Sequence, residues 1–446
     1  MERQDITNTN LVNSMVDTSD RIMGVGDFIW LWLGMTAQMG VFLLGASFTG
    51  RISYLQALLA MIVGNLIVSV ILILNGDVGT KYGLNFSLYL RAPFGEHGRK
   101  IPTFMRALTG IFWFGIQTYY GALAIDIAIE YLTGFSNWFL WYIVFAIVQI
   151  LITAGGIGWI KYIENIAGPA LAVLSLWLIY VLVKGHSFGE FIAMELNDRL
   201  NFWAVVTANL SYWVTVAVNI SDFTRHIVVE EPDGSFIKRN KVSIFGQVPG
   251  ITIGMVLFIS VGMIGKYYTG HGNPVDMISS SLGGYFMLVG LLIILLAQLS
   301  TNVAANLYAP GNILSDIFSE KLNFSKAVLV AGGIGMFTFP WYLLDHFLTY
   351  LPLVGAFLSP LPGIMIVDYY LIRKTNLDMN DFRELTDRYE YSNGFNPAAL
   401  ITYVVAGLVG IRFLKYSWLV SLPTAALLYY ILMNSWIKKK YPNNVL

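Results

Sequence analysis

The sequence contains no cysteine and few charged residues, and both features narrow its class. Without cysteine the chain has no disulfide, no thiol nucleophile and no thiolate metal ligand. Only 12% of its 446 residues are charged, whereas soluble proteins have about 25%, and 56% are hydrophobic. The formal net charge is zero, so nothing indicates nucleic acid as a partner. The composition therefore predicts an all-helical chain that lies mostly in a lipid bilayer.

About twelve apolar runs are long enough to cross a membrane as helices. They cover residues 27–48, 53–75, 103–130, 137–157, 161–183, 202–223, 242–265, 281–308, 326–344, 348–371, 397–414 and 417–437. With the N-terminus inside, all but six of the 27 Lys and Arg fall on the inner side. The positive-inside rule then places both termini in the cytoplasm. We expect a monomeric, multi-pass protein of the plasma (cytoplasmic) membrane.

Four of these runs are interrupted by glycine and by polar residues near their centres. They are the first, third, sixth and eighth runs. The first and the sixth are five spans apart, and so are the third and the eighth. This spacing is typical of two inverted five-helix repeats with broken helices at corresponding positions. We therefore expect repeats at 27–183 and 202–371, two additional helices at 397–437, and cytoplasmic ends at 1–26 and 438–446.

The interrupted runs carry aromatic and carboxamide side chains where lipid would favour Leu and Val. A carboxamide donates and accepts side by side, which matches the edge of a ring amide, and an indole stacks on a flat ring. No Lys, Arg, Asp or Glu lies at the middle of these four runs, which favours a neutral ligand. The predicted ligand-binding residues are Trp113, Gln117, Trp213, Asn306, Asn302 and Gln38.

An alternative interpretation treats these residues as helix-packing groups. Ser, Thr, Asn and Gln often only join membrane helices, and Trp often marks the interface. For a single residue this alternative is as good as a binding role. The complete set favours a binding site, because it spreads over four helices at corresponding depths.

A cation site is predicted beside these residues. The hydroxyls of Ser300 and Thr301, the carbonyl of Ala297 and opened carbonyls at Gly34 and Ala37 would supply neutral oxygens suited to Na⁺. The alternative is that both hydroxyls bond back to carbonyls one turn earlier. If H⁺ drives transport instead, the candidate carboxylates are Asp126, Glu130, Glu164 and Asp222.

Segments in both halves of the chain resemble the nucleobase–cation symporters of the purine, cytosine, uracil, hydantoin and allantoin permease type. The segments are GTKYGLNFSLYLRAPFGEHGRKIPTFMRALTGIFWFGIQT (79–118), NISDFTRH (219–226), STNVAANLYAPGNI (300–313) and GIMIVDYYLIRK (363–374). The resemblance implies a leucine-transporter-like fold of two inverted five-helix repeats plus two helices. It also implies uptake of a planar N-heterocycle driven by Na⁺ or H⁺.

The resemblance also implies a role for each residue of the predicted sites. Trp113 and Trp213 resemble the indoles on the two faces of the ligand, and Gln117 and Asn306 resemble the amides that bind it. Asn302 and Gln38 are further polar contacts. Gly34, Ala37, Ala297, Ser300 and Thr301 resemble the cation site.

Other function classes remain as alternatives. An amino-acid carrier of the same fold would need a site for a carboxylate and an amine, which these residues do not resemble, and a vitamin carrier of the same fold is a further alternative. A membrane enzyme would need a catalytic group in the cavity, and the five histidines lie near predicted loops or helix ends. We therefore expect a transporter that is not an enzyme and has no cofactor apart from its coupling ion.

Overall fold

The computed structural model describes residues 15–155, 158–184, 186–318 and 320–445, but not the side chains of 158–168. Across the described ranges the chain forms helices and no β-strand, with only isolated bridges such as the one between Met23 and Ile227. The predicted all-α class is therefore confirmed.

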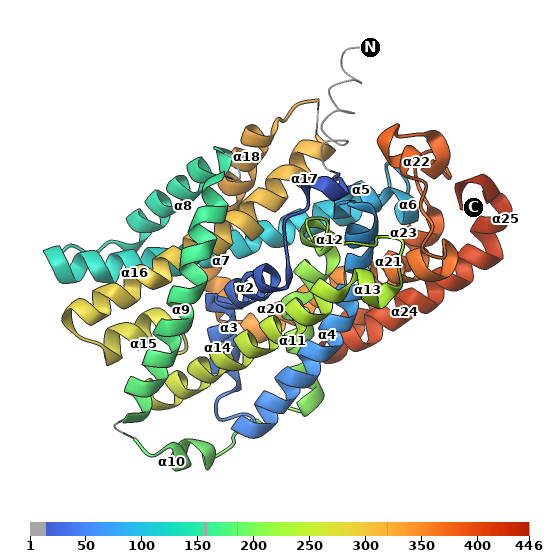
Figure 1. Ribbon diagram of the computed structural model, residues 1–446. Coiled ribbons are helices and arrows are strands. Elements are labelled where there is room, and N and C mark those ends of the chain that lie inside the picture. Colours follow the sequence, from blue (N-terminus) through green and yellow to red (C-terminus); the bar gives the residue numbers. More distant parts are fainter. Residues whose placement is uncertain (1–14, 156–157, 185, 319, 446) are drawn as a thin grey trace.

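Long helices run through the body of the molecule (Figure 1). They are α4 (Tyr54–Tyr82), α7 (Lys100–Thr133), α8 (Trp138–Ala154), α9 (Gly158–Lys184), α11 (Phe202–Asn219), α14 (Val248–Thr269), α16 (Gly284–Thr301), α18 (Phe324–Met336), α20 (Phe347–Leu358), α23 (Pro397–Arg412) and α24 (Ser417–Leu432).

Shorter helices extend or connect the long ones. They are α2 (Val25–Thr36), α3 (Met39–Phe48), α5 (Phe86–Tyr89), α6 (Arg91–Phe94), α10 (Phe188–Ile192), α12 (Ser221–Thr224), α13 (Phe236–Arg239), α15 (Pro274–Ser281), α17 (Ala309–Ile317), α19 (Pro340–Leu344), α21 (Pro360–Ile366), α22 (Met379–Arg383) and α25 (Lys438–Lys440). The 3₁₀ turns are η1 (Thr18–Asp20), η5 (Asp387–Tyr389), η6 (Leu414–Tyr416) and η8 (Pro442–Asn444).

The first apolar run is broken in the middle, as its glycine and polar residues predicted. It forms α2 and α3, whose axes differ by 59°. Ala37 (ψ 59°) and Gln38 (φ −139°, ψ 156°) leave the helical conformation between them. The side-chain amide of Gln38 donates to the Met35 carbonyl at 2.7 Å and so satisfies one of the freed backbone groups.

Among the described residues four segments are π-helical, and one of them lies in the eighth run. They are η2 (Ser243–Gln247), η3 (Asn302–Tyr308), η4 (Val367–Ile372) and η7 (Met433–Ile437). Such wide turns often occur at functional sites. The η3 turn carries both Asn302 and Asn306 and continues into α17, so this helix extends nine residues beyond the predicted end at 308.

Five helices in the described ranges are long and apolar enough to cross a membrane, or six with the bent pair α2–α3. They are Tyr54–Tyr82, Ser243–Thr269, Gly284–Ile317, Phe347–Ile372 and Leu414–Lys440. Helices α7 and α11 are not among them, because their polar and aromatic residues lower the mean hydropathy. The total of twelve spans and the division into repeats therefore stay predictions.

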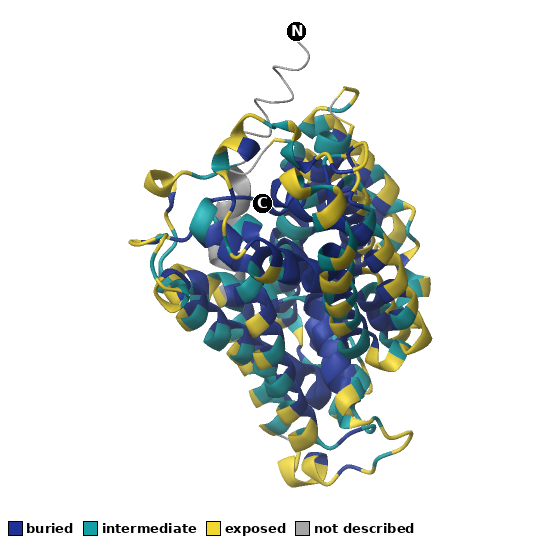
Figure 2. Cartoon of the chain, turned by 90° about the vertical axis from the view of Figure 1, so that its right-hand side faces the viewer, coloured by how far each residue is buried: buried dark blue, intermediate teal, exposed yellow. Residues whose placement is uncertain are grey.

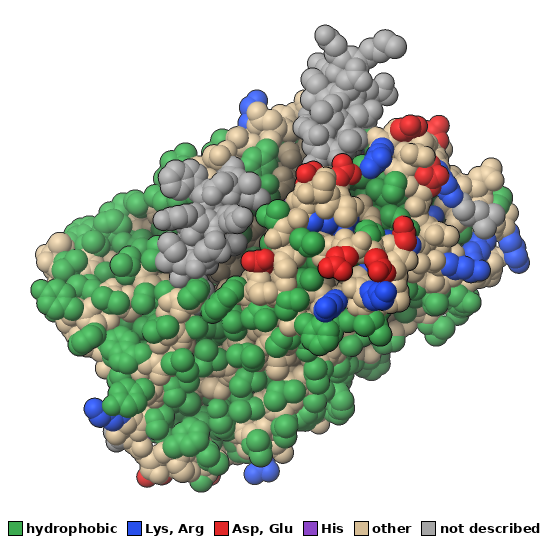
Figure 3. All heavy atoms as spheres, viewed as in Figure 1, with side chains coloured by type: hydrophobic (Ala, Val, Ile, Leu, Met, Phe, Trp, Pro, Cys, Tyr) green, Lys and Arg blue, Asp and Glu red, His purple; other side chains and the backbone are tan. Residues whose placement is uncertain are grey.

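The surface and the interior fit a protein surrounded by lipid. Buried residues fill the centre of the molecule, and most exposed positions lie on the outer faces of the helices (Figure 2). Large apolar side chains such as Leu66, Val70 and Leu292 are exposed there. On the face seen in Figure 3, apolar atoms cover the body of the molecule, and most charged side chains gather at one end. This distribution supports an orientation in which the apolar body lies in the membrane and the charged end lies outside the lipid.

Candidate functional site

Two of the predicted amides meet across the broken helix. Gln117 on α7 donates from Nε2 to Oε1 of Gln38 at 2.8 Å. Gln38 uses its own Nε2 on the Met35 carbonyl, so each amide orientation follows from its hydrogen bonds. Gln117 is 1% exposed, and its Oε1 has no hydrogen-bond partner in the described ranges. A buried acceptor therefore remains available to a ligand.

Trp113 lies one helical turn before Gln117 and forms an aromatic cluster. Its indole packs edge to face on Tyr212, Phe347 and Tyr350, with ring centroids 5.6, 6.1 and 6.1 Å away. The spacing of four residues puts Trp113 and Gln117 on the same side of α7. An aromatic face and an amide edge therefore lie side by side on α7.

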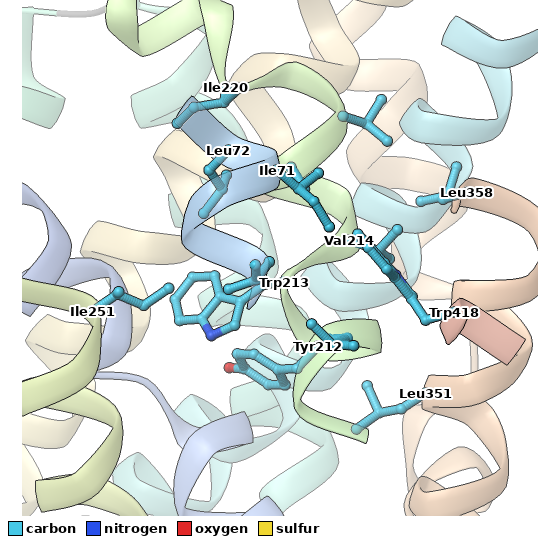
Figure 4. Packing of buried hydrophobic residues seen from close by; sticks show 14 of the residues in the cluster. Ile71, Leu72, Tyr212, Trp213, Val214, Ile220, Ile251, Leu351, Leu358 and Trp418 are labelled. Atoms are coloured by element: carbon cyan, nitrogen blue, oxygen red, sulfur yellow. The ribbon is translucent and has the colours of Figure 1, made fainter. Parts of the chain in front are cut away.

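Trp213 is buried on α11 and forms no ring pair with Trp113. Its indole packs on Trp32 at 5.5 Å and on Tyr212 at 5.4 Å, and its Nε1 has no partner in the described ranges. Tyr212 packs against both indoles, and Figure 4 shows Tyr212 and Trp213 leaving α11 on the same side. The predicted pair of indoles is therefore bridged by a third ring.

Asn302 and Asn306 form a second group on η3. Asn306 donates to Oδ1 of Asn302 at 2.9 Å. Asn302 Nδ2 donates to the Phe114 carbonyl, to Thr118 and to Gln149 Oε1, at 3.1, 3.1 and 2.8 Å. The Asn302 amide thus holds η3 against α7 and α8. It positions Asn306, and its hydrogen bonds leave little capacity for a ligand.

The two groups share α7 but lie on different sides of it. No hydrogen bond or ring contact in the described ranges joins Asn306 to Trp113, Gln117 or Gln38. The structure thus brings together Gln38, Gln117 and Trp113, places Trp213 one ring away, and leaves Asn306 in a neighbouring network.

The predicted cation ligands lie on two helices that both pack on α9. Gly34 and Ala37 belong to the end of α2, and Ala297, Ser300 and Thr301 belong to α16. No hydrogen bond links the two sets in the described ranges. The hydroxyls of Ser300 and Thr301 make no hydrogen bond to a described residue, whereas Thr118 bonds back to the Phe114 carbonyl at 2.7 Å.

Charged groups lie away from the aromatic cluster. Arg106 donates from Nε to Asn219 at 3.2 Å, and Asn219 donates to Asp222 at 3.0 Å. Asp222 also accepts the Phe86 N–H at 2.8 Å. Asp126 accepts from Ser136 and from the Asn137 N–H, so both of these candidate proton carriers are held by hydrogen-bond donors.

For the other two candidate proton carriers the structure shows no buried hydrogen-bonded carboxylate among the described side chains. Glu130 is exposed, and the side chain of Glu164 lies outside the described residues. No group of three His, Asp or Glu in the described ranges is arranged to hold a metal ion.

A cavity of about 540 Å³ lies beside η4, and its wall includes Arg373, Lys374 and Arg388. It shares no residue with the aromatic cluster around Trp113.

Tyr212 is a member of the aromatic cluster that the sequence did not predict. Neighbouring residues on a helix point about 100° apart, so a pattern based on one helical face does not select both Tyr212 and Trp213. The available signal was the position of Tyr212 directly before a candidate indole in the polar sixth run.

A family model described as "Permease for cytosine/purines, uracil, thiamine, allantoin" matches residues 15–436. The chain belongs to this permease family. A hydantoin permease of Microbacterium maritypicum is 30% identical over 442 residues, which cover 97% of this chain and 90% of the relative.

Solved structures of Mhp1, a nucleobase-cation-symport-1 family transporter, are also similar to this permease. The inward-facing conformation matches with a TM-score of 0.90 and 29% identity, over 96% of this chain and 94% of that one. The closed conformation with bromovinylhydantoin bound matches with a TM-score of 0.86 and 30% identity, over 96% of each chain. The permease is therefore a membrane transporter of the nucleobase–cation symporter type with a leucine-transporter-like fold, and it is not an enzyme.

Proposed function

We propose that this permease imports a neutral, planar N-heterocycle together with Na⁺ by alternating access. The observation that carries the proposal is the buried, unpartnered Oε1 of Gln117 beside the indole of Trp113. An amide N–H of a ring stacked near Trp113 would satisfy that acceptor, which otherwise costs about 1–3 kcal/mol. The nearby side chains are uncharged, and this supports a neutral ligand.

The substrate class follows from the chemistry of these groups and from the relatives. A hydantoin, allantoin or nucleobase presents the flat face and the N–H and C=O edge that an indole and a carboxamide recognise. One relative is named a hydantoin permease, and one similar structure holds bromovinylhydantoin. We extend this class to the present chain and place Asn306 and Gln38 at the edge of the same ligand.

Na⁺ is the proposed coupling ion. The hydroxyls of Ser300 and Thr301 are without hydrogen bonds to described residues, which argues against the alternative that they bond back to their own helix. With the carbonyls of Ala297, Gly34 and Ala37 they would offer neutral oxygens from α16 and from the end of α2. Na⁺ would thereby fix the position of α2 relative to α16 before the heterocycle binds.

Coupling to Na⁺ would make the import concentrative. One positive charge entering a cell gains about 2.3 kcal/mol per 100 mV of membrane potential. We place the permease in the plasma membrane as a monomer with both termini in the cytoplasm. The substrate enters from outside, an outer gate closes, and an inner gate opens.

Uptake into membrane vesicles tests this proposal. Vesicles with an inward Na⁺ gradient should accumulate a radiolabelled heterocycle, and vesicles with K⁺ in place of Na⁺ should not. Equal uptake under both conditions that stops when the pH gradient is removed would overturn Na⁺ coupling in favour of H⁺. Failure to take up hydantoin, allantoin, uracil, cytosine or a purine under every gradient would overturn the substrate class.

A further inference from the structure

Tyr212 occupies the position between the two predicted stacking residues. Its ring lies edge to face on Trp113 at 5.6 Å and on Trp213 at 5.4 Å. The side chain is 5% exposed, and its hydroxyl has no hydrogen-bond partner in the described ranges. A buried hydroxyl without a partner is costly in a helix bundle, so its presence beside the aromatic cluster needs an explanation.

The hydroxyl end of Tyr212 reaches the first turn of α3. A Cβ on Gly40 would lie 2.7 Å from that hydroxyl and 3.1 Å from the ring of Trp113. The phenol can approach because Gly40 has no side chain. The same turn follows Gln38, which accepts the hydrogen bond from Gln117. The Tyr212 hydroxyl and the Gln117 acceptor therefore belong to one cluster.

We propose that Tyr212 determines the substrate range of this permease, an inference that rests on the proposed function. Its ring packs on the edge of Trp113 and thereby limits the size of a ring that can bind there to compact rings. Its hydroxyl donates to a carbonyl of the ligand, while Gln117 Oε1 accepts from the adjacent N–H. The preferred ligand is then a small ring in which a carbonyl neighbours an N–H, without a bulky substituent.

Two substitutions separate the role of the Tyr212 ring from that of its hydroxyl. Tyr212→Phe keeps the ring contacts with both indoles and removes only the donor. Loss of one neutral hydrogen bond should weaken binding of a compact ring about three- to tenfold. Tyr212→Ala removes the ring that limits ligand size, so a ring with a bulky substituent should gain relative to the compact ring, by about tenfold for about two buried methylene equivalents.

The experiment measures binding to the purified full-length protein, by calorimetry or tryptophan fluorescence. The first step screens the wild type with hydantoin, allantoin, uracil and cytosine; binding to none of them contradicts the proposed function itself. The second step compares the compact ring that binds with its bromovinyl derivative in the wild type, Tyr212→Phe and Tyr212→Ala. Bromovinylhydantoin serves as the bulky probe for hydantoin.

Tyr403→Phe on α23 is the matched control, because its hydroxyl is likewise buried and without a partner in the described ranges. It should leave the affinity for the compact ring unchanged. If Tyr212→Phe also leaves that affinity unchanged, the hydroxyl does not contact the ligand. If Tyr212→Ala does not shift preference towards the bulky ring, Tyr212 does not limit size. Should Tyr212→Ala fail to fold, Tyr212→Leu provides the size comparison.

Discussion

At the scale of single residues, Gln117 and Gln149 show how one side-chain type serves two purposes. Gln117 keeps a buried acceptor free beside Trp113, whereas Gln149 bonds to Asn302, Thr118 and the Phe145 carbonyl. The first arrangement can receive a ligand, and the second holds helices together. The sequence alone could not separate them, because both are polar residues in apolar runs.

Substituting these two glutamines should have opposite effects. Gln117→Ala should abolish ligand binding and leave the unfolding temperature in detergent within a few degrees of the wild type. Gln149→Ala should lower that temperature, because several buried groups lose a partner at about 1–3 kcal/mol each, and should keep binding. Thermal unfolding with and without ligand measures both effects. Normal ligand binding by Gln117→Ala would contradict its place in the site.

Trp113→Ala provides the aromatic counterpart of this test. Stacking of a base on an aromatic ring contributes about 1–3 kcal/mol, so the affinity should fall at least fivefold. Trp203→Ala, at an exposed position on α11, is the control and should bind normally. Titration of ligand into each purified variant gives the comparison. Equal affinities for the two variants would exclude Trp113 as a stacking residue.

The hydroxyl of Thr301 can be tested against a threonine that is already bonded. Thr301→Val should weaken the Na⁺-dependent stabilisation by substrate, because one proposed oxygen ligand is lost. Thr207→Val on α11 removes a hydroxyl that donates to the Trp203 carbonyl at 2.9 Å, so it should retain the Na⁺ effect. Melting temperatures at increasing Na⁺ concentration measure the difference. An unaltered Na⁺ effect in Thr301→Val would reject the proposed cation site.

At the scale of helices, α3 approaches Tyr212 closely because Gly40, in its first turn, has no side chain. Gly40→Ala should reduce ligand binding and destabilise the protein by about 1–3 kcal/mol, since the new methyl group would overlap Tyr212. Gly26→Ala in α2 has open space around it and serves as the control. Ligand titration and thermal unfolding follow both properties. Wild-type behaviour of Gly40→Ala would show that α3 does not pack tightly on Tyr212.

The sequence predicted helix positions better than helix ends. The run at 202–223 and the helices α11 and α12, which end at Thr224, agree closely. The predicted eighth run ends at 308, whereas the helix continues to Ile317. In the structure Pro310 directly follows the π-helical turn η3, and the helix continues through it to Ile317. The predicted run at 326–344 is divided in the structure, because α18 ends at Met336 and Phe339, with a φ of 47°, separates it from α19.

π-Helical turns could not be predicted from the sequence. Apolar periodicity distinguishes a helix from a strand, but a single wide turn changes that period too little to detect. The η3 turn decides how Asn302 and Asn306 are oriented. The spacing of four residues therefore predicted that Asn302 and Asn306 lie close together. Only the structure shows that Asn302 bonds to α7 and α8 while Asn306 bonds to Asn302.

At the scale of the whole molecule, orientation is the expectation that the structure leaves for experiment. The sequence has no cysteine, so each introduced cysteine is the single thiol of the chain. Ser235→Cys, before α13, should be protected from a membrane-impermeant maleimide in intact cells. Ser187→Cys, before α10, should react. Both positions are exposed, and labelling of permeabilised cells is the control. The reverse pattern would place the termini outside.

Fold class and family could be predicted from composition and from four sequence segments, because lipid imposes long apolar helices and the segments are specific. The arrangement of the proposed site residues could be predicted only in part. Helical spacing placed Trp113 and Gln117 on one side of α7, whereas the contact between Gln38 and Gln117 joins separate segments. Tyr212 and its contact with Gly40 depend on how separate helices pack, which no local pattern encodes.

The break at Ala37 and Gln38 has a consequence for isotope exchange. The N–H groups of Met39 and Gly40 begin α3 and donate to no residue in the described ranges. Amides inside an unbroken membrane helix keep their protium for long periods, since neither water nor base reaches them. In deuterated buffer these two amides should take up deuterium whenever water reaches the start of α3. Bound substrate that excludes this water would slow their exchange. The exchange rate would then report occupancy of the substrate site without a labelled substrate.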